Sequence, residues 1–308
     1  MTHPARDQWA QWLLHRRFGG NPQQQKKIEE RLAQIRDHVL QRARIKAEET
    51  MLDVGCGDGL IAFGALDAVG EQGTVIFSDI SQDLLDHCHT LAQQMHMLDR
   101  SQFLQASAED LSALASQSVD VVTTRSVLIY VKKKREAFQH FYRVLKPGGR
   151  LSLFEPINRF AFSDSASPHR FFGYEIGPVR PLIQKVWTSY RRAQPSQDNP
   201  MMDFDERDLF TFAERAGFAE VHLELQASVV PGGTEWDDED ERHRWETFLK
   251  SSPNPLAPTF EEAMQQTLTA EEAEQLTAYL RPLVEKNQRE ERSSVAYLWA
   301  VKHARTSV

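Results

Sequence analysis

The sequence predicts an α/β fold in which helices cover both faces of a mostly parallel sheet. Short apolar runs alternate along the chain with helical patterns, starting with a run at 51–54 and a helix at 60–68. A strand–helix alternation implies parallel strands, because each helix carries the chain back to start the next strand. The length of 308 residues, with 41% hydrophobic and 26% charged residues, suits one large or two small soluble domains.

The first strand is followed by a glycine-rich turn. Three glycines stand at alternate positions behind an acid: Asp53, Gly55, Gly57 and Gly59. Glycine lets the backbone approach a ligand closely, and the free N–H groups of helix 60–68 favour an anionic group. The third glycine of a dinucleotide fingerprint is replaced by Leu60, and the Gly-Lys-Ser/Thr end of a P-loop is absent. We therefore expect another nucleotide-type cofactor; the alternative is a turn that binds no ligand.

The next apolar run also ends in an acid. Residues 73–81 are expected to form a strand, and Asp79 lies 20 positions after Gly59 (79 − 59). In doubly wound folds a carboxylate at the tip of the second strand accepts hydrogen bonds from ribose hydroxyls. Ser81 is the expected N-cap of a helix over 82–95. The alternative for Asp79 is that it only caps a turn.

Five motifs in order resemble class I S-adenosylmethionine (SAM) methyltransferases of the type 11 kind. They are the D-x-G-x-G-x-G turn at 53–59, the strand at 73–81, Gln-Ala-Ser-Ala-Glu-Asp-Leu at 105–111, the strand at 118–127, and Leu-Lys-Pro-Gly-Gly at 145–149 before a strand at 151–155. The resemblance implies a Rossmann-like sheet of seven mostly parallel strands, completed at 219–226 and 293–302, and SAM as the cofactor. The chain departs from many relatives at Ser107, where they have aspartate.

The resemblance also assigns the cofactor-binding residues. Asp53 would order the glycine turn and help to hold the methionine end of SAM, and Asp79 would bind the ribose. Ala108 and Glu109 would flank the adenine. The full expected set is Asp53, Gly55, Cys56, Gly57, Gly59, Asp79, Ile80, Ala108, Glu109 and Arg125. Cys56 is expected to be there for its small size rather than as a nucleophile.

The acceptor side is expected at the carboxyl ends of the strands at 118–127 and 151–155. Arg125-Ser126-Val127 resembles the Arg-Asn-Val stretch of ubiquinone and menaquinone biosynthesis C-methyltransferases, whose arginine belongs to the acceptor site. Arg125 could hold a carboxylate or an enolate-like oxygen, or form an ion pair with Glu155. Glu155 could act as a base, orient an amine, or pair with Arg125 or Arg159. The catalytic candidates are Arg125, Glu155 and Asn158.

The rest of the chain suggests additions around this core. We expect an N-terminal helical lid (1–46), the SAM-binding core (47–156), a substrate-cap insertion (157–200), the core continuation (201–226), an acidic helical insertion (227–292), and a last strand with the tail (293–308). An amphipathic helix is expected over 26–47, after an aromatic helix at 9–14. Capping-box patterns begin at Thr259 and Thr269. The acidic insertion could complete the substrate cap or form a homodimer surface.

Composition excludes several classes of function. Residues 227–292 contain 15 acidic and 7 basic residues, which accounts for the whole net charge of −8. The only basic run, 132–135, is expected to be a solvated helix start, so a nucleic-acid partner is not expected. Two cysteines give neither a disulfide framework nor metal-ligand spacing. The absence of an apolar run of roughly 20 residues argues against a membrane segment, and the cytoplasm is the expected location.

We therefore expect a SAM-dependent methyltransferase that acts on a small molecule at oxygen, nitrogen or carbon by in-line displacement. The protein would mainly hold the acceptor in line with the methyl group and exclude water. The first alternative is a C-methyltransferase of a quinone or polyketide-like ring, favoured by Arg125. A protein methyltransferase is less favoured, because the aromatic residues of the expected cap at 157–200 suggest an enclosed pocket. An alternative of another class is a SAM-binding regulatory or scaffold protein without turnover.

Overall fold

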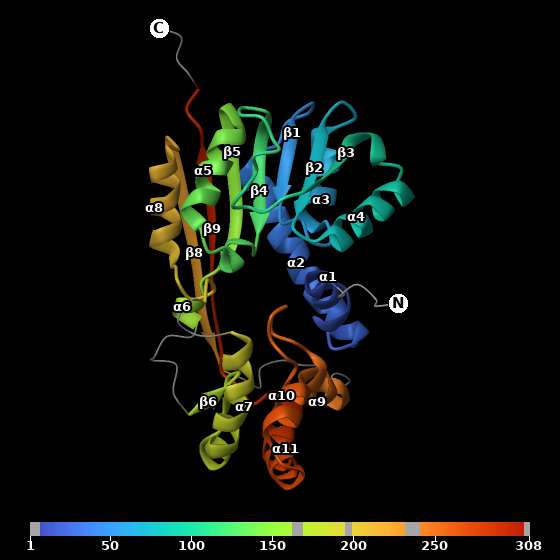
Figure 1. The fold of residues 1–308 in the computed structure, drawn as a ribbon, viewed down its shortest axis with the longest axis vertical. Helices are drawn as coiled ribbons and strands as arrows, with labels where there is room; N and C mark the ends of the chain where they lie inside the picture. The colour runs from blue at the N-terminus through green and yellow to red at the C-terminus, as the bar shows by residue number, and fades with distance from the viewer. Residues whose placement is uncertain (1–6, 162–168, 195–198, 232–240, 305–308) are drawn as a thin grey trace. The chain divides into compact units, whose positions relative to one another are not determined.

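The computed structural model describes residues 7–161, 169–194, 199–231 and 241–304 (Figure 1). The chain divides into two compact units. The core unit comprises residues 29–159, 200–226 and 294–308, and the helical unit comprises 1–28, 160–199 and 227–293. The chain passes from one unit to the other four times inside regular elements: the helices α2 (Pro22–Ala43) and α6 (Asn158–Ala161) and the strands β8 (Glu220–Val230) and β9 (Glu291–Val301).

A seven-stranded sheet with the order β3-β2-β1-β4-β5-β9-β8 forms the centre of the core unit. Besides β8 and β9, the strands are β1 (Thr50–Val54), β2 (Thr74–Asp79), β3 (Ser101–Gln105), β4 (Val119–Arg125) and β5 (Leu145–Pro156). The strands β1 to β5 pair in parallel, and β9 runs antiparallel to β5. The predicted seven-stranded, mostly parallel sheet is confirmed.

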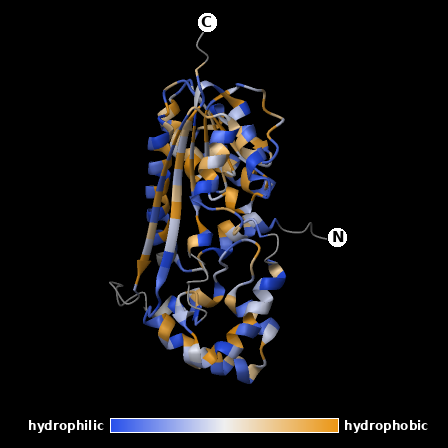
Figure 2. Ribbon diagram, turned by 90° about the vertical axis from the view of Figure 1, so that its left-hand side faces the viewer, coloured by the Kyte–Doolittle hydropathy of each residue, from blue (hydrophilic) through white to orange (hydrophobic). Residues whose placement is uncertain are grey.

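Helices cover both faces of this sheet. They are α3 (Leu60–Val69), α4 (Gln82–Gln94), α5 (Lys134–Val144) and α8 (Glu206–Ala216), together with α2. Neighbouring strand residues alternate between two buried clusters, since Met51 packs with α2 and α3 whereas Leu52 packs with α5 and α8. In Figure 2 the strands carry long hydrophobic stretches, while hydrophilic residues lie on the outer surfaces of the helices.

The helical unit has a hydrophobic centre of its own. It contains α1 (Gln8–Gln11), the π-helical turn Trp12–Arg16, a hairpin of β6 (Arg170–Phe171) and β7 (Tyr174–Glu175), α7 (Arg180–Ala193), α9 (Glu241–Lys250), α10 (Phe260–Thr267) and α11 (Ala270–Glu285). The short helix α6 (Asn158–Ala161) starts in the core unit. Phe171, Tyr190, Trp245 and Phe260 are among the buried side chains. Both predicted capping boxes, at Thr259 and Thr269, are present.

The bounds of one predicted helix are corrected. The helix predicted over 26–47 begins earlier, at Pro22, and ends at Ala43, because Arg44 adopts a left-handed φ of 48° that stops the helix. Parts of the two expected insertions lie outside the described residues: 162–168 and 195–198 of the substrate cap, and 232–240 of the acidic insertion. In the part of the chain that the structure describes, no helix is both long enough and apolar enough to cross a lipid bilayer.

Candidate functional site

The turn between β1 and α3 has a backbone that only glycine accommodates easily. Gly55, Gly57 and Gly59 have φ values of 67°, 58° and 84°, in the left-handed region that side chains disfavour. A Cβ on Gly55 would lie 2.3 Å from Cγ2 of Val127, and one on Gly59 would lie 2.4 Å from Cε2 of Phe63. Cys56 is buried between them, and its amide donates to the Ser78 carbonyl at 2.9 Å. The cysteine is therefore part of the packing, as expected.

Asp53 lies fully buried behind this turn. Its Oδ1 accepts a hydrogen bond from the Thr123 hydroxyl at 2.8 Å. Burial raises the pKa of Asp53 to about 7, although the Thr123 hydroxyl and the positive charge of Arg125 act in the opposite direction. A carboxylate so deeply buried is sensitive to any positive charge that comes to lie beside it.

Several buried polar atoms around the turn have no hydrogen-bond partner within the described part of the protein. They are Oδ2 of Asp53, Oδ1 of Asp58, Oγ of Ser78 and Oγ1 of Thr124. In the register of the sheet, Ser78 and Thr124 lie on either side of Val54, at the carboxyl ends of three neighbouring strands. Buried polar groups normally have partners, so this edge of the sheet has the unmet hydrogen-bonding capacity that a polar ligand such as SAM would use.

Asp79 connects the glycine turn to the start of α4. Its Oδ2 accepts from the Gly57 amide and its Oδ1 from the Ser81 amide, both at 2.9 Å. Each carboxylate oxygen has a second lone pair that can accept a hydroxyl. Ile80 follows and is 48% exposed, so an apolar surface lies next to the acid. The predicted N-cap is confirmed, since the Ser81 hydroxyl accepts from the Leu84 amide.

The segment 107–109, expected beside the adenine, is hydrogen-bonded to the residue that precedes α5. Ala108 is buried. The Glu109 carboxylate accepts a hydrogen bond from the Lys133 amide at 2.7 Å, and the Glu109 amide donates to the Ser107 hydroxyl at 3.2 Å. Glu109 is therefore held by a backbone contact, and Ser107, the position that departs from the family pattern, stabilises the local turn.

The three acceptor-side candidates differ in exposure. Arg125 and Asn158 are partly exposed, at the end of β4 and the start of α6. Glu155 has an exposure of 0%. Its Oε1 accepts from the amides of Val127 and Leu128, both at 2.9 Å, and its Oε2 accepts from the Ile129 amide at 3.2 Å. The expectation that Glu155 faces the acceptor is not met by this arrangement, because backbone amides occupy both oxygens.

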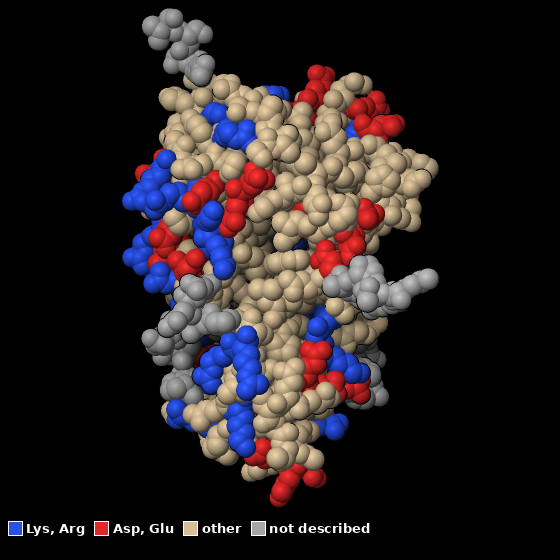
Figure 3. Space-filling model, viewed as in Figure 1, with Lys and Arg blue, Asp and Glu red and all other residues tan. Residues whose placement is uncertain are grey.

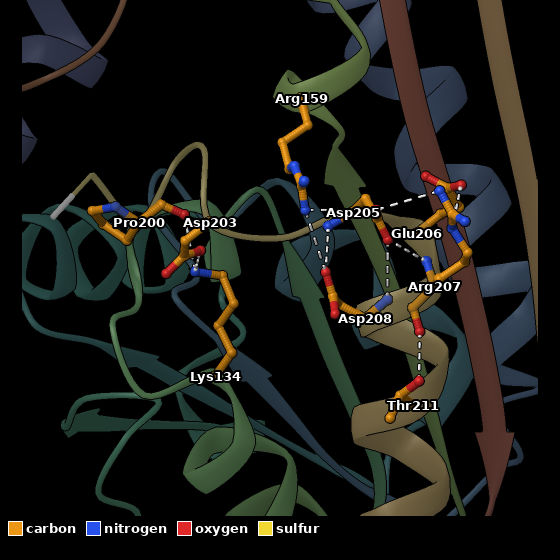
Figure 4. A network of polar contacts seen from close by, with 9 residues as sticks. All are labelled: Lys134, Arg159, Pro200, Asp203, Asp205, Glu206, Arg207, Asp208 and Thr211. Atoms are coloured by element: carbon orange, nitrogen blue, oxygen red, sulfur yellow. Dashed lines mark hydrogen bonds and ion pairs between the residues drawn. The ribbon is translucent and has the colours of Figure 1, made fainter. Parts of the chain in front are cut away.

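The ion pairs considered for Glu155 are not found among the contacts of the described residues. Arg159 lies instead 3.7 Å from Oδ2 of Asp205 and 4.0 Å from Oδ2 of Asp208, at the start of α8 (Figure 4). Burial raises the pKa of Glu155 to about 7, against the lowering influence of the three amides and the positive charge of Lys134. The carboxyl group therefore titrates close to neutral pH.

Lys134 is the residue that the sequence interpretation missed. The run 132–135 does start a helix, α5, and Lys132 and Lys133 are exposed, but Lys134 is only 4% exposed. The expectation of a solvated side chain is therefore wrong at this position. The signal was helical spacing, because Lys134 precedes the buried Ala137 and Phe138 by three and four residues, which places it on the same face.

Charge and metal-ligand patterns add little to the site. Acidic and basic side chains are interspersed on the face shown in Figure 3, with uncharged surface between them. Among the described residues, histidine, cysteine, aspartate and glutamate form no group that could hold a metal ion. The candidate site is thus a nucleotide-type cofactor site at the carboxyl edge of the sheet.

Known proteins share this core. The model of the ubiE/COQ5 methyltransferase family matches residues 30–231. The ubiquinone/menaquinone biosynthesis C-methyltransferase UbiE of Haemophilus ducreyi is 30% identical over 189 residues, which cover 60% of this chain and 71% of that protein. The UbiE protein of Klebsiella pneumoniae is 29% identical over 188 residues, covering 60% of this chain and 73% of that protein.

Solved structures show the same fold at lower identity. A Bacillus halodurans protein has a TM-score of 0.52 and 19% identity, covering 87% of this chain and 98% of that chain. Phosphoethanolamine N-methyltransferase 2 of Haemonchus contortus, solved in complex with SAM, has a TM-score of 0.50 and 17% identity, covering 88% of this chain and 52% of that chain.

Proposed function

Because the chain belongs to the ubiE/COQ5 methyltransferase family and is a SAM-dependent methyltransferase, we propose that it methylates a ring carbon of a small quinol-type molecule. The observation that carries the proposal is the similarity to UbiE proteins over most of their length. The match of the family model ends at residue 231, so most of residues 227–292 have no counterpart in it. The acceptor ring can therefore differ from the acceptor of the UbiE relatives.

The residues of the core suit this chemistry. SAM, when bound, supplies a methyl group on a positively charged sulfur. Asp53, Asp79 and the glycine turn would hold the cofactor, with Ile80, Ala108 and Glu109 beside its adenine. Arg125 would hold an oxygen of the acceptor ring and favour its ionised form, since a nearby cation stabilises an anion. A ring carbon next to an ionised hydroxyl is nucleophilic, so the step needs no covalent intermediate on the protein.

The remaining expectations from the sequence stay predictions. They are the lid at 1–46, the cap at 157–200, Asn158 as a residue on the acceptor side, a homodimer surface in 227–292, and a cytoplasmic location. An acceptor that is a small molecule rather than a nucleic acid is supported by the interspersed charges in Figure 3 and by the family.

Methyl-labelled SAM tests the proposal directly. The purified protein is incubated with labelled SAM and a naphthoquinol that lacks the ring methyl group, and with the same compound in its oxidised quinone form. We expect label on a ring carbon of the quinol only, in a bond that resists ether-cleaving conditions. Label in an ether, an amine or protein would contradict ring C-methylation.

A matched pair of arginine variants tests the role of Arg125. Arg125→Ala is expected to bind S-adenosylhomocysteine almost normally and to lose nearly all turnover. The control is Arg135→Ala, which removes an exposed arginine at the start of α5 and should retain turnover. Equal turnover in the two variants would remove Arg125 from the acceptor site. Cofactor binding without turnover on any acceptor would favour a regulatory protein.

A further inference from the structure

The turn that follows β4 is held in an unfavourable backbone conformation. Ser126 has a φ of 55°, which costs conformational energy in a residue other than glycine. Its amide donates to the Phe154 carbonyl at 2.8 Å, and a 3-10 turn follows over Leu128–Tyr130. Such a conformation persists only where contacts with neighbouring residues hold the backbone in place.

Glu155 makes some of the contacts that hold this turn. Its carboxylate accepts the three successive amides of Val127, Leu128 and Ile129. Hydrogen bonds to an ionised acceptor are stronger than those between neutral groups. Glu155 therefore fixes the first half of the turn from beneath.

Val127 carries this restraint to the cofactor turn. A Cβ added at Gly55 would lie 2.3 Å from Cγ2 of Val127, so the valine packs directly on the glycine backbone. Any shift of the turn 126–131 would change that contact. The position of Gly55 is thus connected to Glu155 through a single side chain.

Lys134 holds the other end of the same turn. Its ammonium group donates to the Val131 carbonyl at 2.8 Å. It also donates to the Pro200 carbonyl at 2.9 Å and to the Asp203 carboxylate (Figure 4). These three partners match its three protons. The ammonium also lies 4.7 Å from the ring centre of Phe204, which is almost fully buried. Lys134 therefore joins the turn to the segment where the chain returns to the core unit.

We propose that Lys134 and Glu155 form a positioning pair that fixes the turn 126–131 against Gly55 and so sets the affinity for SAM. Neither side chain needs to touch the cofactor or the acceptor. The inference goes beyond the proposed function, because it concerns cofactor binding and holds for any acceptor. Lys134 then has a role that no motif of the sequence indicates.

Binding of S-adenosylhomocysteine, measured by calorimetry, tests the pair without any acceptor. Lys134→Met is expected to weaken binding by at least about tenfold, since removing one partner of a buried ionic network is costly. Lys132→Met is the matched control, two positions away and exposed, and should bind as the wild type does. A folded Lys134→Met protein with wild-type affinity would overturn the proposal.

Two further variants keep the proposal testable if Lys134→Met does not fold. Asp203→Asn leaves both carbonyl partners of Lys134 in place, and Glu155→Gln keeps one acceptor oxygen beneath the turn. Both should weaken binding while the melting curves stay cooperative. The double variant should lose less affinity for S-adenosylhomocysteine than the product of the two single losses, because both substitutions act on the same turn. Purely multiplicative effects, or unchanged affinity in both, would contradict the pair.

The pH dependence of binding separates positioning from a general loss of stability. Burial lowers the pKa of Lys134, although Asp203, Glu155 and Glu109 act in the opposite direction, and the positive charge of Lys134 lowers the pKa of Glu155. Without the ammonium group, the pKa of Glu155 should rise further. The pH at which affinity falls on acidification should therefore be higher in Lys134→Met than in Lys132→Met. An identical midpoint in these two proteins would count against the coupling.

Discussion

The core unit and the helical unit bury different kinds of side chain. Among the described residues, the buried charged side chains all belong to the core unit: Asp53, Asp79, Lys134, Glu155 and Lys302. The buried polar residues described in the helical unit are uncharged: Ser189, Ser252, Asn254 and Thr259. A buried charge is costly unless it has partners. Lys302 donates to the carbonyls of Tyr142 and Leu145 near the start of β5, and the other four charges lie near the carboxyl ends of the strands. The helical unit is instead stabilised by aromatic packing and helix caps.

The largest effect is expected from the charge at the end of β2. Asp79→Ala removes two contacts to backbone amides and the proposed ribose contacts. Since hydrogen bonds to a charged group contribute about 1.5–3 kcal/mol each, affinity for S-adenosylhomocysteine should fall at least about a hundredfold. The control is Asp83→Ala, an exposed acid in the first turn of α4. Similar calorimetric affinities for the two variants would contradict the assignment of Asp79.

A cavity created in the helical unit tests whether cofactor binding by the core unit depends on the packing of the helical unit. Phe260 is 1% exposed, and its ring centre lies 5.4 Å from that of Phe171 and 4.9 Å from that of Phe248. Phe260→Ala should lower the free energy of unfolding by about 3–5 kcal/mol, while cofactor affinity stays near that of the wild type. Phe160→Ala, at an exposed position, is the control. Loss of cofactor binding in Phe260→Ala alone would show that the core unit depends on this packing.

The buried acid Glu155 predicts an unusual pH dependence of stability. Its pKa is raised from 4.5 to about 7, so the folded state binds this proton more tightly than the unfolded chain. The resulting stabilisation is complete below pH 4.5 and is lost as the pH rises to 7. Relative to Glu155→Gln, the wild type should lose about 3 kcal/mol over this range. Urea unfolding across the range checks this, with the exposed Glu71→Gln as control; a constant difference would contradict it.

The smallest effect is expected at a helix cap in the helical unit. The Thr259 hydroxyl accepts from the Glu262 amide at 3.2 Å, and the Glu262 carboxylate accepts from the Thr259 amide at 2.9 Å. Thr259→Ala should cost about 1 kcal/mol of stability. Thr269→Ala removes the same type of cap from α11 and provides a matched comparison. If Thr259→Ala lowered the free energy of unfolding as much as Phe260→Ala, the cap would stabilise the helical unit as much as the aromatic packing does.

The sequence predicted the parts of the site that depend on local patterns. Alternate glycines after a strand and an acid at the next strand end predicted a cofactor site at this edge of the sheet. The positive φ values explain why glycine is needed at those positions. The contacts of Glu155 could not be predicted, because its partners are backbone amides 26–28 residues away. Lys134 was misjudged because its charge was considered with its neighbours in sequence rather than with the helix face it shares.

The helical unit shows the same limit. Its capping boxes were predicted, since each spans only four residues. Its aromatic cluster joins Phe171 and Tyr190 to Trp245 and Phe260, from segments separated by part of the core. Nothing local in the sequence indicates that these segments meet, so the sequence showed two insertions where the structure has one packed unit.

The order of strands has a consequence for synthesis on the ribosome. The strand β9 is the last described strand to be made, yet it lies between β5 and β8 inside the sheet. Until residues 291–301 leave the exit tunnel, the nascent chain has two strand edges without their partner, and such edges invite pairing with other chains. The core can therefore close only after residues 291–301 have been made, well after the cofactor turn at 53–59 has emerged.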